Sequence, residues 1–158
     1  MAIARKIEEY MAQHGLDYEV VMHMHSHSSM ETAELAHVPG DRLVKSVILE
    51  DDDGYVMAVL PSTQHVRIGK LSRALNRKLR LATEDELAPL FADCELGAIP
   101  PVGLAYGVTT IMDESLAEQP EIYFEAGDHE NLVRMSRSAF MALMEHADHA
   151  RFGHRSWI

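Results

Sequence analysis

The sequence is poor in cysteine and contains no long apolar run. Cys94 is the only cysteine among 158 residues, so an intrachain disulfide is excluded and a reducing compartment is the simplest environment. No apolar stretch approaches the roughly 20 residues that a membrane-spanning helix needs. The chain reaches charge at once with Arg5 and Lys6, and Glu8 and Glu9 follow, which is unlike a secretory signal. These absences predict a cytoplasmic protein that makes no contact with a membrane.

Acidic residues are missing from one long stretch of an otherwise acidic chain. The sequence holds 14 Lys and Arg against 25 Asp and Glu, a formal net charge of −11. Between Gly54 and Thr83 there is no acid, whereas Lys70, Arg73 and Arg77 fall on one side of a helix by their spacing. A local basic face can bind a phosphate backbone, because charges act over a Debye length of roughly 8 Å at physiological salt. The alternative is a solvated helix face. The candidate contacts to a polyanion are Arg67, Lys70, Arg73 and Arg77.

Local patterns predict a mixed α/β fold in a single domain of residues 1–158. Helices are expected at 2–14, 29–38, 69–76, 84–91 and 137–149, and strands at 18–24, 43–50, 55–60, 80–82, 104–106, 108–112, 122–126 and 132–135. Ser28 with Glu31, and Thr83 with Glu86, have the spacing of capping boxes at two of the helix starts. Several neighbouring strands look connected as hairpins. We therefore expect a largely antiparallel, curved sheet or a partly closed barrel, wrapped by helices.

Lys45 stands out because it lies near the start of an otherwise apolar strand. Alternation places it on the face of Leu43, Val47 and Leu49. An ammonium among such side chains costs desolvation free energy unless an anion meets it. The pattern therefore indicates either a lysine that binds a negative charge, or one whose stem is buried while its ammonium reaches water.

Alternating histidines give the sequence its best metal-binding signal. His23, His25 and His27 would share one face of a strand, and His37 or His65 could complete a site. No cysteine pair and no His-Glu-x-x-His motif supports such a site. We expect no metal and no cofactor, and keep a metal-dependent hydrolase built on these histidines as an alternative.

Three local patterns in one order resemble those of a known family. Leu43–Leu49 places a lysine near the start of an apolar strand after a Pro-Gly turn. Gly97–Gly103 has the form Gly-x-x-x-Pro followed by a glycine, and Phe124–Gly127 is a strand that runs into a glycine before the last strand and helix. From about Tyr18 to about Met144, the chain resembles the YbaK/EbsC family of aminoacyl-tRNA editing domains.

The resemblance implies a substrate and a reaction. Members of the family hydrolyse the ester between a wrongly attached amino acid and its tRNA, either as free-standing proteins or as insertions in prolyl-tRNA synthetase. They need no metal, and the size and shape of a pocket select the amino acid. The implied partner of this chain is therefore a mischarged tRNA, with the basic stretch as its contact surface.

The resemblance also implies roles for particular residues. Lys45 matches the family's catalytic lysine, and the backbone amides of Gly97 and Ala98 would hold the oxyanion of the tetrahedral intermediate. A rigid turn without catalytic function is the alternative for this loop, and a solvent-exposed turn histidine is the alternative for His129. The implied substrate-binding residues are His25, Ile99, Pro101, Gly103, Gly127 and His129.

We interpret the sequence as a free-standing aminoacyl-tRNA deacylase in which a bound water attacks the ester carbonyl. Ser46 adjoins Lys45 but is expected on the opposite face, and no Ser-His-Asp set is present, so a covalent acyl-enzyme is not expected. A non-catalytic tRNA-binding or protein-interaction module of the same fold is the alternative. The sequence leaves open the amino acid and tRNA, the proton-transfer group, the oligomeric state, and the role of the tail from Arg151 to Ile158.

Overall fold

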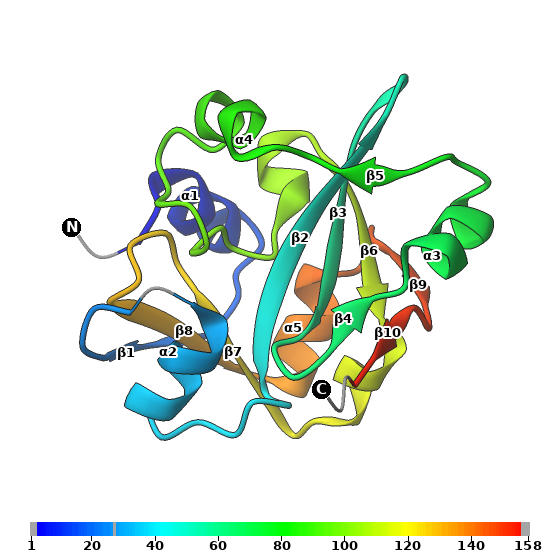
Figure 1. Ribbon diagram of the computed structural model, residues 1–158. Helices are drawn as coiled ribbons and strands as arrows, with labels where there is room; N and C mark the ends of the chain where they lie inside the picture. Colours follow the sequence, from blue (N-terminus) through cyan, green and yellow to red (C-terminus); the bar gives the residue numbers. More distant parts are fainter. Residues whose placement is uncertain (1–2, 27, 156–158) are drawn as a thin grey trace.

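A mixed sheet forms the centre of the protein in the computed structural model, which describes residues 3–26 and 28–155. Its strands follow the order β1-β8-β7-β2-β3-β6-β9, β5 pairs with β2, and β4 and β10 form a separate ribbon (Figure 1). The strands are β1 (Glu19–Met22), β2 (Leu43–Asp51), β3 (Gly54–Pro61), β4 (His65–Val66), β5 (Arg80–Leu81), β6 (Thr109–Asp113), β7 (Glu121–Glu125), β8 (Asn131–Ser136), β9 (Asp148–Ala150) and β10 (Gly153–His154). The helices are α1 (Arg5–Gln13), α2 (Ser29–Leu35), α3 (Ile68–Leu75), α4 (Glu84–Leu90) and α5 (Arg137–Leu143), with 3-10 turns η1 (Gly103–Tyr106) and η2 (Glu114–Glu118).

The mixed α/β class is confirmed, and the sheet does not close into a barrel. β2 pairs antiparallel with β3 and β5, and β8 pairs antiparallel with β1 and β7. β7 with β2, β3 with β6, and β6 with β9 are parallel. Most pairings are therefore antiparallel, as predicted, and the parallel junctions add long connections across the sheet that neighbouring hairpins do not predict.

Short-range signals place most element ends where the sequence predicts them. The β2–β3 hairpin turns at Gly54 (φ +139°), and the Asp51 carboxylate accepts the N–H groups of Asp53 and Gly54 at 2.9 and 3.1 Å. The Ser28 hydroxyl accepts the N–H of Glu31 at 3.1 Å, and Thr83 begins α4 with a full capping box. These bonds satisfy backbone donors that the turn and the first helical turns leave unpaired.

Both faces of the sheet are covered. Along β3, Met57 and Val59 pack into the core that α1 and α5 cover, whereas Val56, Ala58 and Leu60 pack on the opposite side with α3 and the C-terminal segment. All five side chains are fully buried, so the usual alternation of a half-exposed strand is absent here.

Two predicted elements are wrong in type or extent. Residues 104–106 form the 3-10 turn η1 rather than a strand, because the tight turn returns the N–H of Val108 to the carbonyl of Gly103 at 2.8 Å. A Cβ at Gly103 would collide with Thr110, so the close approach requires glycine. The last helix ends at Leu143 rather than near residue 149, and the following segment forms β9 against β6.

The C-terminal segment docks on the fold as far as it is described. Phe152 is fully buried, and the N–H groups of Phe152 and Gly153 donate to the buried Asp113 carboxylate at 2.9 and 2.8 Å. These bonds hold the pKa of Asp113 below its ordinary value although burial opposes the shift. Residues 156–158 of the predicted tail lie outside the described part. Among the described helices, none has the length and apolar character needed to cross a bilayer.

Candidate functional site

The sheet splits beside Lys45. β7 pairs with β2 only through Tyr123 next to Leu43 and Phe124 next to Val44, and β5 joins the same edge only at the far end of β2. Within the described residues, the edge between these two junctions has no strand partner. Figure 1 shows β2 and β7 diverging upward from their contact, with the segment that precedes η1 lying between their separated ends. Lys45 is thus the first residue of β2 beyond the contact with β7.

The Gly97–Gly103 loop attaches to β2 at this split. The Ser46 hydroxyl donates to the carbonyl of Ile99 at 2.7 Å, which ties the loop to the residue that follows Lys45. The N–H of Ala98, a predicted oxyanion donor, already donates to the carbonyl of Glu95 at 3.1 Å. By contrast, the N–H groups of Gly97 and Ile99 donate to no other residue in the described part of the chain. At the end of the loop that begins with Gly97, the free amides are therefore those of Gly97 and Ile99.

The remaining predicted loop residues lie in the packed part of the same turn. Pro101 and Gly103 are buried, and Gly103 begins η1. Ala98 is fully buried, whereas Gly97 is exposed at φ +84°, a conformation that favours glycine. The loop thus presents its glycine end, rather than its proline end, to solvent.

Lys45 lines an open cleft of about 500 Å³ on the other face of β2. Burial lowers the pKa of its ammonium, and Lys45 forms no ion pair with any described residue. The other lining residues are mostly hydroxyl-bearing or basic: Ser28, Ser29, Ser62, Thr63, His65 and Arg155. Arg155 differs from Lys45 because its guanidinium contacts both carboxylate oxygens of Asp41 at 2.6 Å.

Lys45 and Ser46 are consecutive residues of β2 whose side chains lie on opposite faces of the sheet. Lys45 lines the cleft, whereas Ser46 binds the loop. No residue of the Gly97–Gly103 loop lines the Lys45 cleft as it is described. The alternation expected for Lys45 and Ser46 is therefore present in the structure. A ligand that contacts both would have to pass the edge of β2 where no strand pairs.

Buried histidines and a carboxylate lie at the end of β7. His23 Nε2 is 2.8 Å from Glu125 Oε1, and His129 Nδ1 is 3.0 Å from Glu125 Oε2. His129 Nε2 contacts the carbonyl of Leu96 at 2.7 Å, so both nitrogens of this predicted substrate ligand face protein atoms. Burial raises the pKa of Glu125, although the neighbouring histidines oppose the shift. The sequence analysis did not identify Glu125 as a functional residue. The one feature that could have indicated it is a carboxylate at the end of an otherwise apolar strand.

His25 and Gly127 lie next to this cluster. The His25 side chain is 42% exposed, its ring meets the His129 ring edge-on at a centroid distance of 5.7 Å, and its Nε2 is 3.4 Å from Glu95. Gly127 has φ +120°, and an added Cβ would come within 3.1 Å of the Ala4 side chain. The need for glycine at 127 therefore arises from its backbone conformation and from close packing against Ala4, the residue before α1. His25 is the imidazole of this region that solvent reaches.

The predicted tRNA-binding cations between residues 67 and 77 differ in whether they pair with a carboxylate. Lys70 and Arg73 are exposed on α3, and Arg67 is exposed immediately before it; none of the three forms an ion pair with a described residue. Arg77 instead donates twice to the Asp51 carboxylate, at 2.6 and 2.7 Å, and lowers the pKa of Asp51 to about 2. Although the stretch itself contains no acid, Asp51 thus reaches Arg77 from the preceding hairpin turn, and Arg77 is not available to a phosphate as a free cation.

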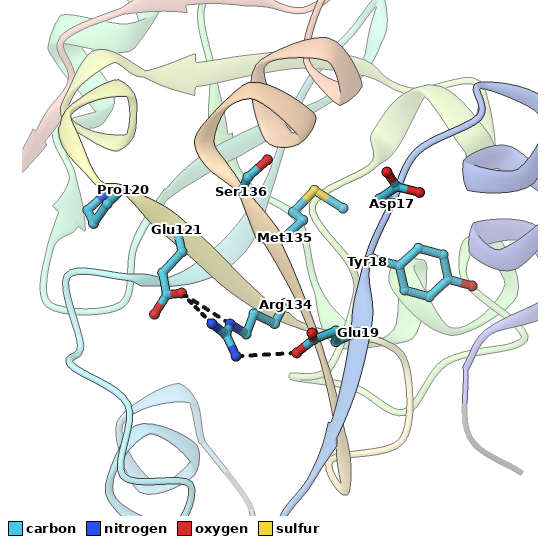
Figure 2. A pocket seen from close by; sticks show the side chains of 8 residues that line it. All are labelled: Asp17, Tyr18, Glu19, Pro120, Glu121, Arg134, Met135 and Ser136. Atoms are coloured by element: carbon cyan, nitrogen blue, oxygen red, sulfur yellow. Dashed lines mark hydrogen bonds and ion pairs between the residues drawn. The ribbon is translucent and has the colours of Figure 1, made fainter.

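A second cavity, of about 430 Å³, lies at the opposite edge of the sheet. Among the described residues that line it, Arg134 is the only cation, and its guanidinium lies 3.0 Å from Glu121 and 3.2 Å from Glu19. Figure 2 shows Arg134 between these two carboxylates. Because both carboxylates compensate the guanidinium, this cavity offers no uncompensated charge to an anion.

The alternating histidines do not gather into a metal site in the described part of the chain. His23 faces the buried Glu125, whereas His25 is partly exposed, and no group of three potential ligands is placed to hold a metal ion there. His27 lies outside the described residues.

Comparisons with known proteins show which proteins this chain is similar to. The chain is similar to the proline–tRNA ligases of Thermotoga neapolitana (33% identity over 87 residues) and Pseudothermotoga lettingae (35% over 75 residues). These matches cover 54% and 47% of this chain, but only 15% and 13% of the ligases.

Solved structures share the fold over almost the whole chain. One is a candidate trans-editing enzyme for prolyl tRNA synthetase, with TM-score 0.83 and 24% identity over 96% of both chains. Another is the hypothetical protein APE2540, with TM-score 0.84 and 23% identity over 95% of this chain and 100% of that one. A family model described as an aminoacyl-tRNA editing domain matches residues 23–143, which confirms the resemblance seen in the sequence. Because the match spans most of the chain, this protein belongs to the family of aminoacyl-tRNA editing domains.

Proposed function

We propose that this protein hydrolyses the ester bond of a mischarged aminoacyl-tRNA. Family membership supports this reaction class, and the observation that carries the proposal is Lys45, a half-buried ammonium without a carboxylate partner among the described residues. Such a cation favours an anionic ligand, because an anion offsets the cost of its desolvation. The names of the matched ligases favour, as the substrate, a tRNA that proline–tRNA ligase charges. We also propose that the protein acts in the cytoplasm, because editing domains serve translation.

The proposed reaction uses both faces of β2. Lys45 binds the terminal phosphate or ribose end of the tRNA, and the acylated end reaches the Gly97 loop past the unpaired edge of β2. A water oxygen attacks the ester carbonyl carbon, and the N–H groups of Gly97 and Ile99 stabilise the resulting oxyanion. The bond to the ribose oxygen then breaks, and that oxygen takes up the proton released by the water. The products are the free amino acid and uncharged tRNA.

The exposed cations of α3 provide the proposed contact to the tRNA backbone. Arg67, Lys70 and Arg73 have no ion-pair partner among the described residues, which supports their use for phosphate. Arg77 is proposed to contribute indirectly, because its guanidinium is already bound by Asp51 and holds the hairpin.

A panel of tRNAs, each mischarged with a different amino acid, tests the proposal. We expect the protein to release at least one amino acid faster than spontaneous hydrolysis, with correctly charged tRNA left intact. Binding without release from any member of the panel would contradict the proposed function and favour the non-catalytic tRNA-binding module. Activity that chelation abolishes and added zinc restores would favour the metal-dependent alternative.

A further inference from the structure

Three buried side chains from separate segments meet at the end of β7. The side chains of His23, Glu125 and His129 are 0%, 5% and 5% exposed. His23 follows β1, Glu125 ends β7, and His129 lies in the turn before β8. One carboxylate therefore faces two imidazoles, His23 at 2.8 Å and His129 at 3.0 Å, in a place that water does not reach.

Backbone carbonyls fix the tautomer of both rings. His23 Nδ1 lies 2.6 Å from the carbonyl of Met24, and His129 Nε2 lies 2.7 Å from the carbonyl of Leu96. A carbonyl can only accept, so each of these nitrogens carries a proton, and the other nitrogen of each ring faces Glu125. Glu125 thus contacts His23 Nε2 and His129 Nδ1, the two ring nitrogens whose protonation state the backbone carbonyls do not fix.

The number of shared protons decides how many of these contacts are hydrogen bonds. One proton between the carboxylate and the two ring nitrogens makes one hydrogen bond, and a second proton makes both. Glu125 Oε2 and His129 Nδ1 are close, but they are not aligned as a hydrogen bond and have no other partner within the described residues. The neighbouring charges are Asp128, which raises the pKa of Glu125, and the His25–Glu95 pair beside the His129 ring.

The cluster is connected to the Gly97 loop by direct bonds. His129 holds the carbonyl of Leu96, the residue before Gly97. The N–H of Glu95 donates to the carbonyl of Gly127 at 2.7 Å, and the N–H of Ser26 donates to the carbonyl of His129 at 3.3 Å. The turn that contains His129 is thus hydrogen-bonded to the start of the loop and to the segment that follows β1.

We propose that Glu125 is a positioning residue: its carboxylate, shared by His23 and His129, holds His129 against Leu96 and so fixes the Gly97 amide. This inference rests on the proposed function for its effect on the reaction, since that amide is the proposed oxyanion donor. Glu125 itself touches no substrate. Its removal is therefore expected to lower kcat and leave KM nearly unchanged, because the Lys45 cleft is intact.

Glu125→Ala and the isosteric Glu125→Gln test the inference, with Glu121→Gln as the matched control. Glu121 lies on the same strand but pairs with the exposed Arg134. We expect the kcat of Glu125→Ala to fall about 10–100-fold, by analogy with residues that orient metal-binding histidines through a hydrogen bond. A smaller loss is expected for Glu125→Gln, which keeps the shape of the side chain, and Glu121→Gln should match the wild type. An undiminished kcat in folded Glu125→Gln and Glu125→Ala would overturn the inference.

Two further readouts separate positioning from general damage to the fold. The double variant Glu125→Ala/His129→Ala should lose no more kcat than the worse single variant, because Glu125 acts through His129. Amide hydrogen exchange at Glu95 and Ala98, whose N–H groups donate to the carbonyls of Gly127 and Glu95 at the start of the loop, should speed up in Glu125→Ala and Glu125→Gln but not in Glu121→Gln. Losses that multiply in the double variant, or exchange at Glu95 and Ala98 that stays unchanged, would contradict the proposal. The exchange measurement does not require catalysis, so it decides the positioning claim even if the wild type deacylates nothing.

Discussion

Lys45 lies near the start of β2, and Arg77 binds Asp51 at its end. Both cations are partly buried, but their surroundings differ. Arg77 donates to Asp51 through two nitrogens, and its side chain is 22% exposed. Lys45 lines a cleft with hydroxyl groups around it and no carboxylate partner among the described residues. The pKa of Arg77 is raised by its partner, whereas burial lowers that of Lys45. The comparison teaches that the engaged cation stabilises the fold, while the cation without a counter-ion suits a ligand.

The largest expected effect is on deacylation, which should depend on Lys45 but not on Arg77. Replacing Lys45 by Met keeps the stem and removes the charge, so we expect kcat/KM for the mischarged tRNA to fall on the order of 10²–10³-fold. The free energy of unfolding should not decrease, because a poorly solvated charge has been removed. Lys78→Met is the control for an exposed lysine. A Lys45→Met protein that deacylates at the wild-type rate would break the comparison.

A smaller effect on activity is expected from the free cations of α3. Replacing Arg67, Lys70 and Arg73 by Gln should raise KM on the order of tenfold and flatten the dependence of log affinity on log salt by about 2–3. The control triple replaces Arg5, Arg137 and Arg151, which changes the net charge equally elsewhere on the surface. Equal losses in the two triples would assign the effect to net charge rather than to this face.

Gly97→Ala sharpens the assignment of the loop. Because Gly97 has φ +84°, an alanine is expected to cost about 1 kcal/mol of unfolding free energy and to displace the free amide. We expect a fall in kcat that is smaller than that of Lys45→Met, measured together with urea unfolding. Gly15→Ala, at φ +61° beyond the end of α1, is the control for strain alone. A similar loss of kcat in Gly15→Ala would contradict a specific role for the loop.

Arg77 should affect stability and its pH dependence rather than turnover. Since Arg77 depresses the pKa of Asp51 from 3.8 to about 2, the pair contributes stability above pH 3.8 that is lost as the pH falls toward 2. Chemical denaturation at several pH values should therefore show Arg77→Met less stable than the wild type near neutral pH, with the gap narrowing in that window. A gap that stays constant down to pH 2 would count against the ion pair.

The smallest effect is expected at Cys94. Burial raises the pKa of its thiol to about 12, and its sulfur contacts the Tyr106 hydroxyl at 3.2 Å. The thiolate fraction at neutral pH is therefore minute, and alkylation should be slow in the native protein and fast after unfolding. Cys94→Ser should retain the wild-type kcat/KM. Rapid alkylation of the folded protein with loss of activity would contradict this account.

The parts of the fold that local patterns specify could be predicted from the sequence. The β2–β3 hairpin follows from Asp51 and Gly54, and two helix starts follow from Ser28 and Thr83. Alternation along β2 correctly separates Lys45 from its neighbour. These features depend on residues within a few positions of one another, where spacing carries the information.

Features that depend on distant partners could not be predicted in this way. β9 and β10 pair with strands far away in the sequence, and Phe152 reaches a carboxylate on β6. Glu125 binds His23 across 102 positions, so no local spacing links the two. The bond from the N–H of Ala98 to the carbonyl of Glu95 depends on the conformation of the turn, so the sequence did not show that this predicted oxyanion donor is already engaged.

The central claim is that Lys45 is the cation that meets the anionic end of a tRNA, and NMR of its labelled side-chain ammonium tests it most directly. The titration of Lys45 would be followed with and without a non-hydrolysable aminoacylated 3′-terminal oligonucleotide. Because burial lowers the pKa of Lys45 and a bound anion opposes that shift, the account predicts that the oligonucleotide raises it. Saturating oligonucleotide that leaves the Lys45 titration unchanged would contradict the account.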